Sequence, residues 1–196
     1  MSQVKAIIGL GNPGPKYDNT RHNAGAWVIE AVAKHHNVPL RLEKKFQALY
    51  ARLSLAGEDR YLLFPQTYMN RSGASVAAFC QFFKLSPPEL LVAHDELDLL
   101  PGTARYKHGG GHGGHNGLRD IASALGNDKS FSRIRVGIGH PGDSSQVTQY
   151  VLGNPGKAER AAIDAVLEEI LATLPLTLEG EWSKAMNRLH SFSASK

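Results

Sequence analysis

The chain has 196 residues, of which 42% are hydrophobic and 20% are charged. This length suits one domain with its own core, so residues 1–196 are expected to form a single domain. No apolar run approaches the roughly 20 residues that span a bilayer, and the N-terminus lacks the long apolar stretch of a signal peptide. The net charge of +4 permits a nucleic-acid or phosphate partner without requiring one.

The chain contains one cysteine, Cys80. A single cysteine excludes an internal disulfide and a cysteine-based metal cluster. Cys80 lies in an apolar stripe with Val76, Phe79 and Phe83, which predicts a position in the core. With no targeting or membrane-spanning segment expected, the cytoplasm is the predicted compartment.

The spacing of apolar residues predicts the elements in chain order. Strands are expected at residues 5–10, 49–55, 60–64, 90–94, 102–107 and 134–138. Helices are expected at residues 23–36, 72–84, 118–125, 157–174 and 181–190, with a very short capped turn at 86–89. Strands and helices alternate over most of the chain. This predicts an α/β fold, a single-domain globule with a twisted mixed β-sheet flanked by helices.

A glycine-rich loop precedes the expected helix at residues 118–125. Within residues 108–117 the chain carries six glycines and three histidines. Glycine approaches a ligand closely, and a loop that opens a helix points N–H groups outward toward anions. The loop is therefore expected to contact a substrate. Its three histidines also suggest a metal site, but flexible glycines between the ligands would preorganise that site poorly. Asn116 is well placed as the N-cap of the following helix.

Three further polar segments follow predicted strands, at residues 9–14, 94–98 and 139–143. Ligands of α/β sheets bind beyond the carboxyl ends of strands. We therefore expect these segments and the glycine loop to meet in one cleft.

The segment at residues 9–14 matches the spacing G-x-G-x-x-G that binds dinucleotides. Pro13, Gly14 and Pro15 prevent a helix from starting inside it, and no acidic residue follows at the expected strand end. The segment is better explained as a tight turn, or as a rigid support that turns the amide of Asn12 toward a cleft.

His22 lies at the entry to the first expected helix. Asn19, Thr20 or Asn23 could cap that helix, whereas a histidine is not needed there and can serve as a general base at neutral pH. Asp95 closes an apolar strand and is the best candidate to orient His22, while Glu96 and Asp98 are expected to be solvated.

Other polar residues allow either a structural or a binding role. Asn70 could cap a helix and Met69 could fill the core, whereas an exposed Tyr68 would suit recognition of a base or a peptide. Lys107 and Arg135 are either solvated or form a phosphate clamp. No serine elbow, Walker A segment or nucleophilic cysteine context is present, so hydrolysis by an activated water is the simplest chemistry.

Six segments together resemble the bacterial-type peptidyl-tRNA hydrolases. They read GLGNPG at 9–14, TRHNAG at 20–25, TYMNRSG at 67–73, HDELD at 94–98, GGGHGGHNG at 109–117 and RVGIGHPG at 135–142. They occur in the family's order, and the resemblance runs from about residue 4 to about residue 192.

The resemblance implies a monomeric hydrolase of the ester between a nascent peptide and the 3′ end of tRNA, acting in ribosome rescue during translation without a metal or organic cofactor. The roles that it implies are a base (His22), its supporting carboxylate (Asp95), a residue that distinguishes N-blocked substrate (Asn12), contacts to the peptide and 3′ end (Met69, Asn70, Asn116), contacts to tRNA (Tyr17, Tyr68) and a grip on the 5′ phosphate at the acceptor stem (Lys107, Arg135). The backbone near Gly113 is expected to bind the peptide or the oxyanion.

Two other functions are left open by the residues alone. The segment at 9–14 would suit a nicotinamide-dependent oxidoreductase. The positive net charge would suit an RNA-binding module without catalytic activity.

Overall fold

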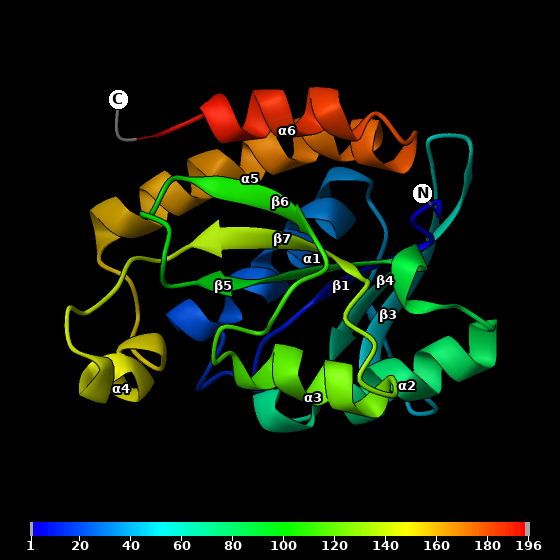
Figure 1. Ribbon diagram of the computed structural model, residues 1–196, viewed down its shortest axis with the longest axis horizontal. Helices are drawn as coiled ribbons and strands as arrows, with labels where there is room; N and C mark the ends of the chain where they lie inside the picture. The colour runs from blue at the N-terminus through cyan, green and yellow to red at the C-terminus, as the bar shows by residue number, and fades with distance from the viewer. Residues whose placement is uncertain (1, 195–196) are drawn as a thin grey trace.

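The computed structural model describes residues 2–194. In these residues one mixed sheet has the strand order β2-β3-β4-β1-β5-β7-β6 (Figure 1). Its strands are β1 (Ala6–Gly9), β2 (Arg41–Glu43), β3 (Ala48–Leu55), β4 (Glu58–Pro65), β5 (Leu90–Glu96), β6 (Ala104–His108) and β7 (Ser132–Gly137). Strand β1 pairs in parallel with β4 and β5, and β5 pairs in parallel with β7. The other three pairings are antiparallel, which confirms the expected mixed α/β sheet.

The helices agree with the expected ones except at short segments. The α-helices are α1 (Ala24–His35), α2 (Ser72–Phe83), α3 (Asn116–Ala124), α4 (Val147–Val151), α5 (Lys157–Leu178) and α6 (Trp182–Ser191), and the 3-10 helices are η1 (Arg21–Asn23), η2 (Met69–Arg71), η3 (Pro87–Glu89) and η4 (Ser144–Gln146). The analysis of apolar spacing did not predict β2 or α4, and it ended α5 four residues early. The capping box that opens η3 is present as expected.

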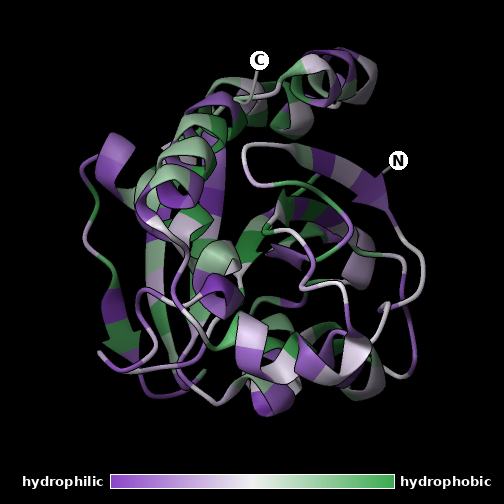
Figure 2. Ribbon diagram, turned by 90° about the vertical axis from the view of Figure 1, so that its left-hand side faces the viewer, coloured by the Kyte–Doolittle hydropathy of each residue, from purple (hydrophilic) through white to green (hydrophobic). Residues whose placement is uncertain are grey.

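Helices cover both faces of the sheet. One core cluster joins the sheet to α1, α5 and α6, and a second joins its other face to α2 and α3. Figure 1 shows α5 and α6 together above the sheet and α2 and α3 below it. Hydrophobic residues gather on the strands and on the inward sides of the helices (Figure 2). Cys80 is buried in the second cluster, as expected.

Helix α1 approaches β5 very closely. A Cβ on Gly25 would lie 2.2 Å from the carbonyl oxygen of Ala93, so only glycine fits at this contact. The close packing brings η1, which directly precedes α1, over the carboxyl end of β5. It therefore sets the distance between His22 and Asp95.

The glycine-rich loop does not leave the sheet at the carboxyl ends of the parallel strands. Because β6 is antiparallel to β7, its last residue, His108, lies beside Ser132 at the start of β7. Residues 109–115 then run back across the sheet, and His115 reaches Asp95 near the end of β5. The loop thus runs from the amino ends to the carboxyl ends of the parallel strands.

None of the helices in residues 2–194 is long and apolar enough to pass through a membrane.

Candidate functional site

A pocket of about 670 Å³ opens at the carboxyl ends of the parallel strands. The end of β1, the loop after β4, the end of β5 and strand β7 all contribute to its wall, and the glycine loop and α4 complete it. The pocket is lined by every candidate residue except Tyr17, namely Asn12, His22, Tyr68, Met69, Asn70, Asp95, Lys107, Gly113, Asn116 and Arg135. The expected convergence of these segments is therefore confirmed.

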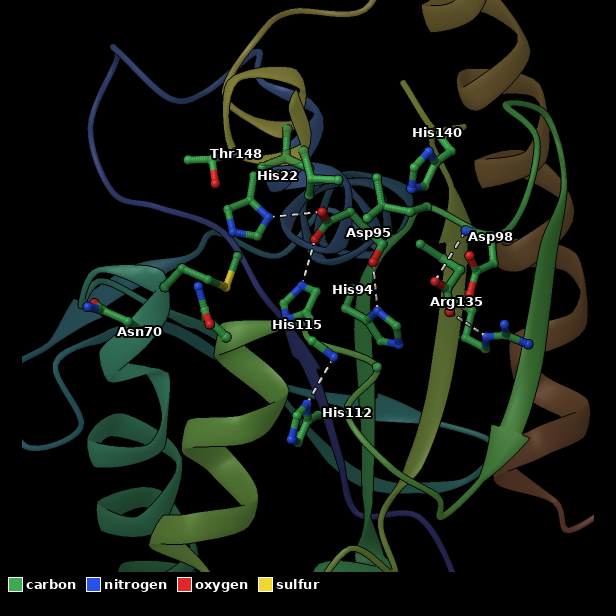
Figure 3. Close-up of a pocket in the computed structure, with 18 of the residues that line it drawn as sticks. His22, Asn70, His94, Asp95, Asp98, His112, His115, Arg135, His140 and Thr148 are labelled. Atoms are coloured by element: carbon green, nitrogen blue, oxygen red, sulfur yellow. Dashed lines mark hydrogen bonds and ion pairs between the residues drawn. The ribbon is translucent and has the colours of Figure 1, made fainter. Parts of the chain in front are cut away.

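Asp95 lies between two histidines (Figure 3). His22 Nδ1 is 2.9 Å from Asp95 Oδ2, and His115 Nε2 is 2.7 Å from Asp95 Oδ1. An ionised carboxylate only accepts hydrogen bonds, so both ring nitrogens that face it carry a proton. In neutral His22 the other nitrogen, Nε2, then holds a lone pair and is free to act as a base.

The contacts between Asp95 and the two histidines shift the pKa values of Asp95 and His22. Burial alone would raise the pKa of Asp95, but its interactions with His22 and His115 outweigh burial and hold that pKa well below the usual range. Burial lowers the pKa of His22, but the charge of Asp95 and its hydrogen bond outweigh this effect and raise the pKa above 6.5. Asp95 therefore remains ionised and makes His22 a stronger base.

His115 has a structural role as well. Its Nδ1 accepts a hydrogen bond from the backbone N–H of Leu118 at 3.3 Å, so it is the N-cap of α3. Asn116 is the first residue of that helix, and the prediction that it caps the helix is wrong. Sequence analysis did not predict the contact between His115 and Asp95.

Beside His115 lies His94, a buried histidine on β5. Its Nδ1 is 2.8 Å from the carbonyl oxygen of Asp95, and its ring packs against that of His115. Burial lowers the pKa of His94 to about 3, so its ring is neutral. It therefore adds no positive charge beside the two histidines that contact Asp95.

Asn12 is held by contacts on both sides of its peptide unit. Its backbone N–H donates to Asn23 Oδ1 at 2.9 Å, and its carbonyl accepts from Asn23 Nδ2 at 3.0 Å. Its side-chain Oδ1 accepts from the N–H of Met69 at 2.7 Å. Asn23 therefore positions Asn12. It is the N-cap residue of α1, one of the three that were expected, but its side chain makes no capping bond to the helix.

Two further amides lie at the exposed rim. Asn70 and Asn116 are both exposed, and neither side chain caps its helix. Met69 is buried and packs in the second core cluster. The amides of Asn12, Asn70 and Asn116 and the side chain of Met69 thus form an uncharged part of the pocket wall.

The basic side of the pocket lies on β6 and β7. Lys107 is exposed, and Arg135 Nε donates to Glu96 Oε1 at 2.7 Å. Glu96 was expected to be solvated, but its side chain is only 18% exposed and forms this ion pair. Because Arg135 uses one N–H for Glu96, the rest of its guanidinium fork remains for an anion.

Two aromatic rings meet near the pocket. The ring of Tyr17 lies edge-on to that of Tyr68, with centroids 6.3 Å apart. Tyr68 is 60% exposed, which leaves a ring face for a nucleotide base or a peptide.

The wall opposite the glycine loop comes from η4, α4 and the residue after α4, and it includes Ser144, Val147, Thr148, Val151 and Leu152. Arg21 attaches α4 to η1. Its Nη1 donates to the carbonyl of Tyr150 at 3.1 Å, and its guanidinium lies over the Tyr150 ring.

Three ligand atoms in the pocket lie close enough for a cation. One atom each of His22, Asp95 and His115 lies within 4.8 Å of the others. His22 and His115 each use a ring N–H to bond one oxygen of Asp95, so a metal ion bound at these atoms would have to displace two protons.

Comparisons with known proteins agree on one family. The sequence profile described as "Peptidyl-tRNA hydrolase" matches residues 6–196. A curated relative of that name from Chromohalobacter salexigens is 71% identical over 194 residues, which cover 99% of this chain and 100% of the relative. Another from Aeromonas hydrophila is 54% identical over 195 residues, covering 100% and 98%. The crystal structure of peptidyl-tRNA hydrolase from Acinetobacter baumannii is similar with a TM-score of 0.95 and 44% identity, covering 99% of this chain and 98% of that chain.

Proposed function

The chain belongs to the peptidyl-tRNA hydrolase family, and we propose that its pocket cleaves the ester of N-blocked peptidyl-tRNA with a water activated by His22 and Asp95. The reaction releases the peptide and a reusable tRNA. The observation that carries the proposal is the contact between His22 Nδ1 and Asp95. It leaves His22 Nε2 as an unprotonated nitrogen at the pocket.

Ester hydrolysis needs few groups. His22 takes a proton from water as the water attacks the ester carbonyl, and Asp95 stabilises the imidazolium that forms. The oxyanion then needs hydrogen-bond donors, which the backbone near Gly113 and the amide of Asn116 supply. The proton returns from His22 to the leaving 3′ oxygen. His22 thus carries the proton from the attacking water to the leaving oxygen, and no covalent intermediate with the enzyme is needed.

The selectivity for blocked substrate follows from the amides. Because Asn12 Oδ1 already accepts from Met69, its Nδ2 is the donor that remains for the substrate. An N-acyl group offers a carbonyl acceptor to that donor, whereas the free amino group of aminoacyl-tRNA offers an ammonium. Asn12, Asn70 and Asn116 bind a peptide backbone without reading its side chains.

The tRNA is bound outside the reacting centre. Lys107 and the free part of the Arg135 guanidinium bind the 5′ phosphate, and Tyr17 and Tyr68 contact the tRNA beside the 3′ end. Cytoplasmic location, the monomeric state and action in ribosome rescue stay predictions.

A single assay tests the proposal. The protein is incubated with N-acetyl-aminoacyl-tRNA and with its unblocked counterpart, with and without EDTA. We expect release from the blocked substrate only, with no effect of EDTA, and a loss of roughly 10²–10⁴ in kcat for His22→Ala. Near-normal kcat in this variant would contradict the mechanism.

The other outcomes point to other functions. Binding of tRNA with no release indicates an RNA-binding module. Loss of activity in EDTA indicates a metal at His22, Asp95 and His115.

A further inference from the structure

The glycine loop has few hydrogen bonds to the sheet that it crosses. At its start, the N–H of Gly109 donates to the carbonyl of Phe131, and at its end His115 contacts Asp95. Between them, among residues 2–194, the contacts that fasten the loop backbone to the sheet come from one side chain on β7, Arg133. Its Nη2 donates to the carbonyl of Gly109 at 2.6 Å, and its Nη1 donates to that of Gly111 at 2.8 Å.

Arg133 is built into the floor below the loop. The residue is only 4% exposed, and its cross-strand neighbour on β6 is Lys107. A Cβ on Gly110 would lie 2.8 Å from Arg133 Nη2 and 2.9 Å from Lys107 Cε. The glycine between the two bound carbonyls therefore lies directly against the guanidinium, with a φ of +96° that residues with side chains rarely adopt.

The guanidinium suits this contact for a chemical reason. Its rigid fork holds two N–H donors at a fixed separation, so it binds two alternate carbonyls of one loop. Hydrogen bonds from a charged donor are stronger than those between neutral groups. A lysine ammonium is a single point of attachment and has no such fork.

We propose that Arg133 is a positioning residue that fixes the glycine loop across the sheet through Gly109 and Gly111. The fixed loop holds Gly113 and Asn116 at the pocket and carries His115 to Asp95. Its effect on catalysis rests on the proposed function, whereas its effect on the loop does not.

The first test measures the loop without substrate. Amide hydrogen exchange is compared in the wild type, Arg133→Gln and Arg133→Lys. We expect exchange of amides 109–115 to rise at least about tenfold in both variants, because each loses the two-carbonyl contact, while β1 and β5 stay protected. Unchanged loop exchange in Arg133→Lys would overturn the proposal, as would a uniform rise across all strands.

The second test measures kinetics on N-acetyl-aminoacyl-tRNA. A misplaced loop disturbs the reacting geometry more than the phosphate contacts, so kcat should fall roughly ten- to a hundredfold with little change in KM. A rise in KM at normal kcat would overturn the positioning role. If the wild type cleaves no substrate, the proposed function fails, but the exchange result still stands by itself.

Arg105→Gln is the matched control. Arg105 lies on β6 beside Arg135 and is exposed. Its substitution by glutamine removes one positive charge, as Arg133→Gln does, but leaves the hydrogen bonds to the loop carbonyls in place. Its loop exchange and kcat should match the wild type. If Arg105→Gln loosens the loop as much as Arg133→Gln does, net charge rather than the Arg133 contact holds the loop, and the proposal is wrong.

Discussion

The side-chain oxygen of Asn12 accepts a hydrogen bond from the backbone N–H of Met69 at 2.7 Å. This contact fixes the orientation of the amide, because the Met69 N–H cannot pair with the Nδ2 group. The Nδ2 donor of Asn12 is thereby assigned to the pocket. The two residues are 57 positions apart in the chain and meet only because β1 and β4 are neighbours in the sheet.

Asn12→Asp replaces that donor with a carboxylate oxygen and keeps an acceptor for Met69. The acyl carbonyl of a blocked substrate then faces an acceptor, so kcat/KM should fall by roughly ten- to a hundredfold. The new negative charge attracts the ammonium of unblocked aminoacyl-tRNA, so the selectivity for blocked substrate should narrow. Both substrates are assayed side by side, and Asn19→Asp, at an exposed position of the stretch between β1 and η1, serves as the control. Unchanged selectivity would remove Asn12 from substrate recognition.

His115→Asn separates the two roles of His115. Asparagine caps a helix well, so α3 should persist, but its side chain is too short to replace the bond to Asp95. A hydrogen bond to a charged group contributes about 1.5–3 kcal/mol to the free energy of unfolding, so the melting temperature should fall. Because Asp95 is then held from one side only, kcat should also fall by roughly tenfold to a hundredfold. His112→Asn alters another histidine of the same loop that does not contact Asp95, and it should have little effect on kcat. Equal losses in the two variants would deny His115 a specific role.

The pH dependence of kcat/KM reports on the base. His22 must be neutral to take a proton, and its pKa is raised above 6.5 because Asp95 outweighs burial. Activity should therefore fall as the pH drops through a midpoint above 6.5. Asp95→Asn removes the charge that raises this pKa, so the midpoint should move to lower pH while the maximal rate also falls. A midpoint that does not move in Asp95→Asn would show that another group is titrating.

Much of this site follows from the sequence because its determinants are local. The apolar runs at residues 5–10 and 90–93 end within two residues of Asn12 and Asp95, and ligands of such sheets bind where parallel strands end. The position of His22 before a helix was equally readable.

The features that were missed depend on long-range geometry or on weak patterns. The contact of His115 with Asp95 requires that β6 run antiparallel to β7, and no local pattern states the direction of a strand. The same holds for Arg133, whose partners are backbone carbonyls without a sequence signature. Strand β2 is short and largely exposed, and α4 has only five residues, so neither shows a full period of apolar spacing.

Gly25→Ala tests the packing that brings η1 over β5. The added Cβ would lie 2.2 Å from the carbonyl oxygen of Ala93, so α1 must move away from the sheet. Overpacking of this kind costs about 1–3 kcal/mol in the free energy of unfolding, measured by denaturant titration. Because the shift separates His22 from Asp95, kcat should fall even where the variant is folded. A variant of normal stability would show that the helix adjusts without strain.

If Lys107 and Arg135 bind a phosphate, removing a positive charge and removing a negative charge beside them should change KM in opposite directions. Lys107→Ala should raise KM and reduce the slope of log KM against log salt by about 1. The variant makes one phosphate contact fewer than the wild type, so binding of the substrate releases fewer counterions. Glu96→Gln removes the carboxylate that competes for Arg135, so KM should fall and the salt slope should steepen. Lys184→Ala, which removes a lysine that does not line the pocket, is the matched control. The same KM and salt slope in Glu96→Gln as in the wild type would mean that Arg135 binds no phosphate.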